Sequence, residues 1–190
     1  MRILLMMLVM LFSVSVAAAQ PVEPIIQADA AILIESGTGR VIYEKNADQV
    51  RPPASMTKMM TCILGLEQLP RKTLIPLSNA AVYAEDNSFQ WKPGDVMQAD
   101  ELLLGMMMVS DNGAAIAVAQ AVSGSVPQFA AAMNEKAAEL GCTNTNFVNP
   151  NGLPNRNHYS TARDMAKIAM YGMKMPDFRK IVSAIEEPIH

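Results

Sequence analysis

The chain has 190 residues, 51% of them hydrophobic, and a formal net charge of −3. This size allows one domain with an ordinary core, and the acidic balance removes any general case for a nucleic acid or an anionic membrane surface as partner. Two cysteines, Cys62 and Cys142, permit one disulfide without requiring it. Cys62 is better interpreted as a small buried hydrophobic residue. No C-x-x-C pair or Cys/His cluster has metal-binding spacing, so we expect no metal or cofactor.

The first residues have the layout of a secretory signal peptide. Arg2 precedes an uncharged apolar run that ends in the three small residues 17–19. We expect cleavage after this run, followed by a leader over 20–29 and one domain over 30–190. Export would place the protein in the periplasm or cell envelope, with no membrane association evident after cleavage. An uncleaved anchor is the alternative, although the run is short for a spanning helix of about 20 residues.

The domain begins with a predicted β-hairpin. Two apolar, β-leaning runs, Ala30 to Ile34 and Arg40 to Lys45, flank a segment with the turn formers Ser36, Gly37 and Gly39. Neither run shows clean polar alternation, which predicts a sheet covered on both faces. An isolated two-stranded hairpin is marginally stable, so such a sheet would normally contain more strands than the sequence shows.

The rest of the chain is mainly helical. The predicted helices are 55–69, 100–109, 113–122, 126–140, 161–173 and 176–185. Ser125 is placed to cap one of them, and Thr161 and Asp164 have the spacing of a capping box. Residues 71–98 are expected to be loop-rich with short strands, and residues 142–159 form a polar loop. The predicted fold class is therefore mixed α/β (α+β).

Ser55 and Lys58 are a candidate nucleophile and base. A serine hydroxyl needs a neighbouring base, and residues i and i+3 are adjacent on a helix. The start of a helix also favours a developing oxyanion. Lys58 can act as a base only if its surroundings disfavour the ammonium form, which its apolar neighbours would do. Taken alone, the pair is weak, because a helix can simply begin with a serine and carry a lysine.

A second polar cluster lies between two predicted helices, at Ser110, Asp111 and Asn112. Ser110 has the chemistry to relay a proton, and Asn112 can bind a substrate amide, both of which suit acyl transfer. The alternative is an ordinary helix–helix turn built from good turn and capping residues.

The ordered motifs S-x-x-K and S-x-N resemble those of the penicillin-recognising serine enzymes. The flanking text, including "AILIESGTGRVIYEKNAD", "RPPASMTKMMT" and "FVNPNGL", is most similar to the low-molecular-mass penicillin-binding proteins of the D-alanyl-D-alanine carboxypeptidase type. The resemblance implies a β-lactamase/transpeptidase-like fold. It also implies a peptidoglycan stem peptide ending in D-Ala-D-Ala as substrate, and β-lactams as acylating inhibitors.

The same resemblance assigns a role to each candidate residue. Ser55 would form the acyl-enzyme and supply one oxyanion donor from its backbone N–H. Lys58 would accept the proton, and Ser110 would assist its transfer to the leaving amine. Asn112 would hold the substrate and orient Lys58.

The sequence departs from this pattern in two places. The family's lysine-threonine-glycine motif is not found, since the one Lys-Thr pair, Lys72 and Thr73, precedes the second motif and is followed by Leu74. We therefore expect residues 30–190 to be a partial catalytic domain that is poorly folded or nearly inactive alone. Gly113 stands where relatives often carry an acidic residue.

Three competing interpretations remain. A class A β-lactamase shares the motifs, but the loop pattern that carries its deacylating glutamate is not found between Asn112 and His190, where Glu135 and Glu139 fall on a predicted helix. A D-alanyl-D-alanine endopeptidase has the same motifs and is the nearest enzyme alternative. A non-catalytic remnant that binds cell-wall peptide is the alternative from another class.

Overall fold

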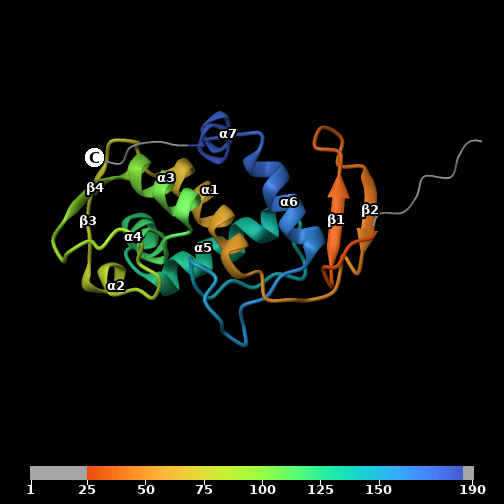
Figure 1. The fold of residues 1–190 in the computed structure, drawn as a ribbon, viewed down its shortest axis with the longest axis horizontal. Helices are drawn as coiled ribbons and strands as arrows, with labels where there is room; N and C mark the ends of the chain where they lie inside the picture. Colours follow the sequence, from red (N-terminus) through yellow and green to blue (C-terminus); the bar gives the residue numbers. More distant parts are fainter. Residues whose placement is uncertain (1–24, 186–190) are drawn as a thin grey trace, which may run out of the picture.

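The computed structural model describes residues 25–185, so the predicted signal peptide lies outside the described part. The strands are β1 (Ala31–Ile34), β2 (Val41–Lys45), β3 (Leu74–Pro76) and β4 (Val96–Gln98). The helices are η1 (Ala54–Thr57), α1 (Lys58–Gln68), α2 (Asn79–Val82), α3 (Ala99–Val109), α4 (Asn112–Ser123), α5 (Val126–Glu139), α6 (Ala162–Gly172) and α7 (Pro176–Val182). The β1–β2 hairpin lies at one end of the described chain and the β3–β4 pair at the other, with the helices between them (Figure 1). The predicted mixed α/β class is confirmed.

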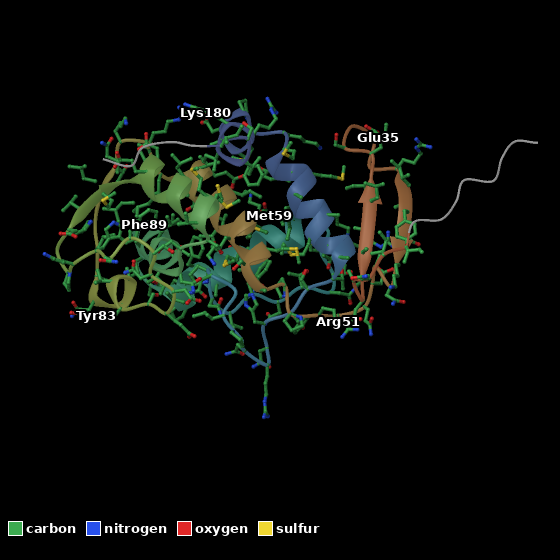
Figure 2. All side chains as sticks on the ribbon, in the orientation of Figure 1. Glu35, Arg51, Met59, Tyr83, Phe89 and Lys180 are labelled. Carbon is green, nitrogen blue, oxygen red and sulfur yellow. The ribbon has the colours of Figure 1, made fainter. Side chains whose placement is uncertain are left out.

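The β1–β2 hairpin forms where the sequence predicted it. The strands pair antiparallel, and the Glu35 carboxylate accepts the backbone N–H groups of Gly37 and Thr38 at 2.8 and 2.7 Å to hold the turn. Figure 2 shows Glu35 at one end of the hairpin and Arg51 at the other. The expectation of a sheet covered on both faces is wrong for residues 25–185, where Leu33 and Ile42 are 54% and 56% exposed. Apolar composition predicts that a strand prefers burial, but not that a covering element is present.

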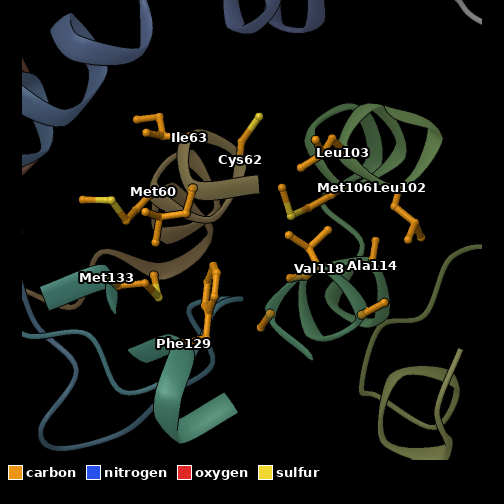
Figure 3. Packing of buried hydrophobic residues seen from close by; sticks show 14 of the residues in the cluster. Met60, Cys62, Ile63, Leu102, Leu103, Met106, Ala114, Val118, Phe129 and Met133 are labelled. Atoms are coloured by element: carbon orange, nitrogen blue, oxygen red, sulfur yellow. The ribbon is translucent and has the colours of Figure 1, made fainter. Parts of the chain in front are cut away.

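Helix α1 lies at the centre of the hydrophobic core. Met60 and Ile63 are fully buried, and Figure 3 shows α1 between Phe129 of α5 and Leu103 of α3. A Cβ atom added at Gly65 would lie 2.6 Å from Cδ2 of Leu103, so α1 and α3 approach each other closely. The all-round apolar sequence of α1 matches this position, because a helix that is apolar on every side is normally buried.

Helix starts agree well with the capping signals in the sequence. The Ser125 hydroxyl accepts the backbone N–H of Gln128 at the start of α5, and Thr161 accepts that of Asp164 at the start of α6. The carboxylate of Asp164 does not return to complete the capping box. It accepts the backbone N–H of Asn144 at 2.9 Å instead, which anchors the polar loop 142–159 to α6.

The segment 71–98 contains the expected short strands, β3 and β4, and also the one-turn helix α2, which the sequence analysis did not predict. Four residues are too few for an amphipathic pattern to be recognised in a sequence. Cys62 and Cys142 are both buried free thiols. Within residues 25–185, no single helix has the length and apolar composition of a membrane span, although α4 and α5 satisfy that criterion as a pair bent by 83°.

Candidate active site

Ser55 lies in η1, the 3₁₀ turn that leads into α1, and its side chain is exposed. The residue before it, Ala54, has a φ of 48°, a backbone conformation that non-glycine residues rarely adopt. No side chain caps η1, and Lys58 Nζ lies 3.2 Å from Ser55 Oγ. The hydroxyl is therefore not used as a helix cap, which removes the main structural reason for a serine at this position.

Lys58 is buried in the centre of the site, with 2% of its surface exposed. Its ammonium nitrogen donates to Ser55 Oγ, to Asn112 Oδ1 at 2.8 Å and to the backbone oxygen of Asn151 at 2.8 Å. Burial lowers the pKa of Lys58 to about 8, while the negative charges of Asp111 and Asp86 act in the opposite direction. A lysine with such a pKa is partly neutral near neutral pH, as a general base must be.

The segment 110–112 connects α3 to α4. Asn112 is in the first turn of α4, where its Oδ1 accepts from Lys58 and its Nδ2 donates to the backbone oxygen of Glu85 at 2.8 Å. Ser110 ends α3 in the left-handed conformation, and its side chain is exposed. Among residues 25–185, no hydrogen bond joins its hydroxyl to Ser55 or Lys58. The structure thus joins Ser55, Lys58 and Asn112 by direct hydrogen bonds. Ser110 is near them because it is two residues before Asn112 in the chain.

Comparison with known proteins identifies the family. The family described as D-alanyl-D-alanine carboxypeptidase, peptidase S11, matches residues 15–188. The chain belongs to this family. The carboxypeptidase DacF of Bacillus subtilis is 39% identical over 166 residues, which are 85% of this chain and 43% of the relative. The D-alanyl-D-alanine endopeptidase of Escherichia coli is 35% identical and is covered to 52% of its length, with 84% of this chain covered.

A solved structure agrees with this assignment. The crystal structure of penicillin binding protein 5 from Haemophilus influenzae superposes with a TM-score of 0.79 at 31% identity. The match covers 84% of this chain and 49% of the solved one. The chain therefore spans about half the length of the relatives it matches. The resemblance inferred from the sequence motifs is confirmed at the level of the family.

One part of this candidate site was not found from the sequence. The turn at residues 149–153 contributes the carbonyl oxygen of Asn151, and the Asn149 side chain holds this turn by accepting the backbone N–H of Gly152 at 2.7 Å. Gly152 has a φ of 88°, and a Cβ atom there would lie 1.9 Å from the carbonyl oxygen of Ala54. The turn therefore packs directly on the backbone next to Ser55. The sequence "NPNGL" indicated a turn, but nothing in it shows which carbonyl faces the lysine.

A buried histidine contacts the S-x-x-K motif at Thr57. His158 is 3% exposed, and its Nε2 lies 2.8 Å from the hydroxyl of Thr57, the residue between Ser55 and Lys58 in the turn. Its Nδ1 accepts the backbone N–H of Val148 at 3.1 Å. Because Nδ1 accepts a hydrogen bond, it carries no proton, and the ring proton lies on Nε2 facing Thr57. Burial lowers the pKa of His158, which favours this neutral form. The sequence analysis did not single out this residue.

Gly113 has a structural explanation. A Cβ atom added there would lie 2.4 Å from the carbonyl oxygen of Ala81 in α2. No side chain fits at this position without movement of α2 or α4, so an acidic residue is excluded from this packing.

Proposed function

We propose that this chain carries the nucleophile and base of a serine-type D-alanyl-D-alanine carboxypeptidase. The observation that supports this best is the position of Lys58 Nζ between Ser55 Oγ, Asn112 Oδ1 and the Asn151 carbonyl, in a buried site. Membership of the family supplies the substrate class, a peptidoglycan stem peptide ending in D-Ala-D-Ala.

In the proposed reaction, the neutral amine of Lys58 takes the proton of the Ser55 hydroxyl while Oγ attacks the carbonyl carbon of the penultimate D-alanine. The oxyanion is stabilised by the Ser55 backbone N–H at the start of η1. When the peptide bond breaks, the proton passes through Ser110 to the amine of the departing D-alanine. Asn112 orients Lys58 and binds the substrate amide. Water then hydrolyses the ester and regenerates Ser55.

A β-lactam would be attacked in the same way. Ser55 Oγ adds to the lactam carbonyl and the ring C–N bond breaks, but the amine stays attached to the acyl group. The adduct should therefore persist longer than the natural acyl-enzyme. The predicted signal peptide and this substrate class both support location in the periplasm or cell envelope.

The test is labelling with a fluorescent penicillin. In the 190-residue chain we expect weak labelling at Ser55, because no lysine-threonine-glycine motif is found in its sequence, and in the family that strand leads to the second oxyanion donor. Loss of one such donor costs about a hundred-fold to a thousand-fold in turnover. A chimaera that adds the rest of the Haemophilus influenzae relative should label strongly. Ser55→Ala should abolish the signal in both proteins. A chimaera that folds but labels no faster than its Ser55→Ala variant would refute the proposal.

A D-alanyl-D-alanine endopeptidase is the second candidate, because the Escherichia coli relative bears that name. The chimaera should release free D-alanine from a pentapeptide faster than it cuts a cross-linked peptide dimer. The reverse order would favour the endopeptidase. Binding of cell-wall peptide without either reaction would favour a non-catalytic remnant.

A further inference from the structure

Asp111 has a fully buried carboxylate that does more than cap a helix. One oxygen accepts the backbone N–H of Ala114 at 2.7 Å and so caps α4. Helices α2, α5 and α6 of the same chain are capped by hydroxyl groups, each of which accepts one backbone N–H. A cap therefore explains only one of the two oxygens, and a buried charge is costly unless it is well hydrogen-bonded.

The second carboxylate oxygen binds the loop 83–92, which is the first part of the connection between α2 and β4. It accepts the backbone N–H of Ser88 at 2.6 Å. The next residue, Asn112, donates to the backbone oxygen of Glu85 in the same loop. Figure 2 labels Tyr83, which follows α2, and Phe89 further along this loop. Two successive residues of the S-x-N segment thus hold one loop at two points.

The start of this loop is fixed by close packing. Gly113 lies against the carbonyl oxygen of Ala81 in α2, as described above, and the lack of a side chain permits this approach. Residues 111 and 112 therefore hold the loop itself, and Gly113 packs on the helix that precedes it. Any shift of the loop would move the Glu85 carbonyl and, with it, the amide of Asn112.

The charge of Asp111 also acts on Lys58. The three groups that accept hydrogen bonds from Lys58 Nζ are neutral. The charged groups that act on Lys58 are Asp111, which is buried, and Asp86, which is exposed and lies in the same loop. Both raise the pKa of Lys58 against the effect of burial.

We propose that Asp111 is a positioning residue for Lys58: its carboxylate fastens the loop 83–92 to the start of α4, so that Asn112 is held between this loop and the lysine. The role rests on the proposed function of Lys58. The test measures hydrogen exchange at Ser88 and the titration of Lys58, and neither readout depends on catalysis. The role of Asp111 can therefore be refuted while the proposed function stands, and the proposed function can be refuted while the role of Asp111 stands.

The test is the substitution Asp111→Asn. Its amide oxygen can still cap α4, but its NH₂ group would face the Ser88 N–H, and the charge is lost. Amide exchange at Ser88 should become roughly tenfold faster or more, as expected for a lost bond to a charged acceptor. In an NMR titration with ¹³C-labelled lysine, the pKa of Lys58 should fall below its starting value of about 8.

Glu35→Gln is the matched control. The Glu35 carboxylate accepts the backbone N–H groups of Gly37 and Thr38 in the β1–β2 turn, so this variant makes the same chemical change outside the loop 83–92. It should change neither readout.

If Asp111→Asn behaves like this control, Asp111 is only a helix cap. A lower pKa of Lys58 with an unchanged exchange rate at Ser88 would show that the charge of Asp111 acts on Lys58 but that its carboxylate does not hold the loop. Faster Ser88 exchange with unchanged Lys58 would show that the loop is not coupled to the lysine. Each of these results overturns the proposal.

Two further measurements test the proposal if Asp111→Asn does not fold. Asp111→Ser retains a cap like those of the other helices and has no second acceptor, so it should show the same two changes. In the unsubstituted chain, Ser88 should have the most protected amide of the loop 83–92, and fast exchange there would refute the proposal without any variant. If the 190-residue chain does not fold alone, the same measurements apply to the chimaera described above.

Discussion

The burial of Lys58 leads to a quantitative prediction for the pH dependence of acylation. With a pKa of about 8, Lys58 is neutral in about one molecule in ten at pH 7 and in about nine in ten at pH 9. A lysine with the reference pKa of about 10.4 would be neutral in roughly one molecule in 2,500 at pH 7. If the neutral amine is the base, the acylation rate should rise about tenfold from pH 7 to pH 9 and then level off.

The assay combines two measurements. The rate of penicillin acylation at Ser55 is followed by mass spectrometry between pH 6.5 and 9.5, using the chimaera where the 190-residue chain reacts too slowly. The Lys58 signal is titrated separately by NMR in ¹³C-labelled protein, and Lys58→Met identifies it. A flat rate over this range, or a Lys58 signal that titrates at about 10 like an ordinary lysine, would refute the reasoning.

The same pKa has a consequence for stability. The unfolded chain keeps the Lys58 proton up to about pH 10.5, whereas the folded chain releases it near pH 8. Between these values the unfolded state binds more protons, so this group makes the free energy of unfolding increase as pH rises. The increase should be missing in Lys58→Met, which urea denaturation at pH 8 and pH 10 would show.

Three other predictions follow from the site. Asn112→Ala removes an acceptor from Lys58 and should slow penicillin acylation by roughly thirty-fold to a hundred-fold, measured against the unsubstituted protein. Gly152→Ala should lower the free energy of unfolding by about 2–4 kcal/mol, because it combines an unfavourable φ with a backbone clash. Gly94→Ala, at a φ of 91° with open space around it, should cost less, and equal urea midpoints would contradict the clash argument. Because burial disfavours the charged form of His158, stability should fall as pH drops below 6.5, and His158→Asn should remove that dependence in urea titrations.

Much of the fold could be predicted because its signals are local. The β1–β2 hairpin, the buried helix α1 and the caps at Ser125 and Thr161 each depend on a few neighbouring residues. The prediction that both faces of the β1–β2 sheet are covered was wrong, because burial of a face depends on other segments packing against it. The Asp164 carboxylate binds the loop at Asn144 rather than completing a capping box, which is again a contact between distant residues.

In the candidate site too, contacts between neighbouring residues could be predicted, and contacts between distant residues could not. The i and i+3 spacing was sufficient to predict that Ser55 and Lys58 meet. The approach of Asn112, 54 residues further along the chain, was implied by family resemblance and not by spacing. The Asn151 carbonyl could not be predicted, because every residue has a backbone oxygen and only the fold aims one at the lysine.

The sequence by itself determined the local elements, the family and the candidate pair Ser55 and Lys58. These depend on side-chain chemistry and short-range spacing, which the order of residues specifies directly. Only the tertiary structure decided that Lys58 is buried, that its nitrogen lies between three acceptors, and that the Asp111 carboxylate accepts a hydrogen bond from Ser88. Burial lowers the pKa of an amine through the loss of water around it, and that loss depends on segments that meet only when the chain folds.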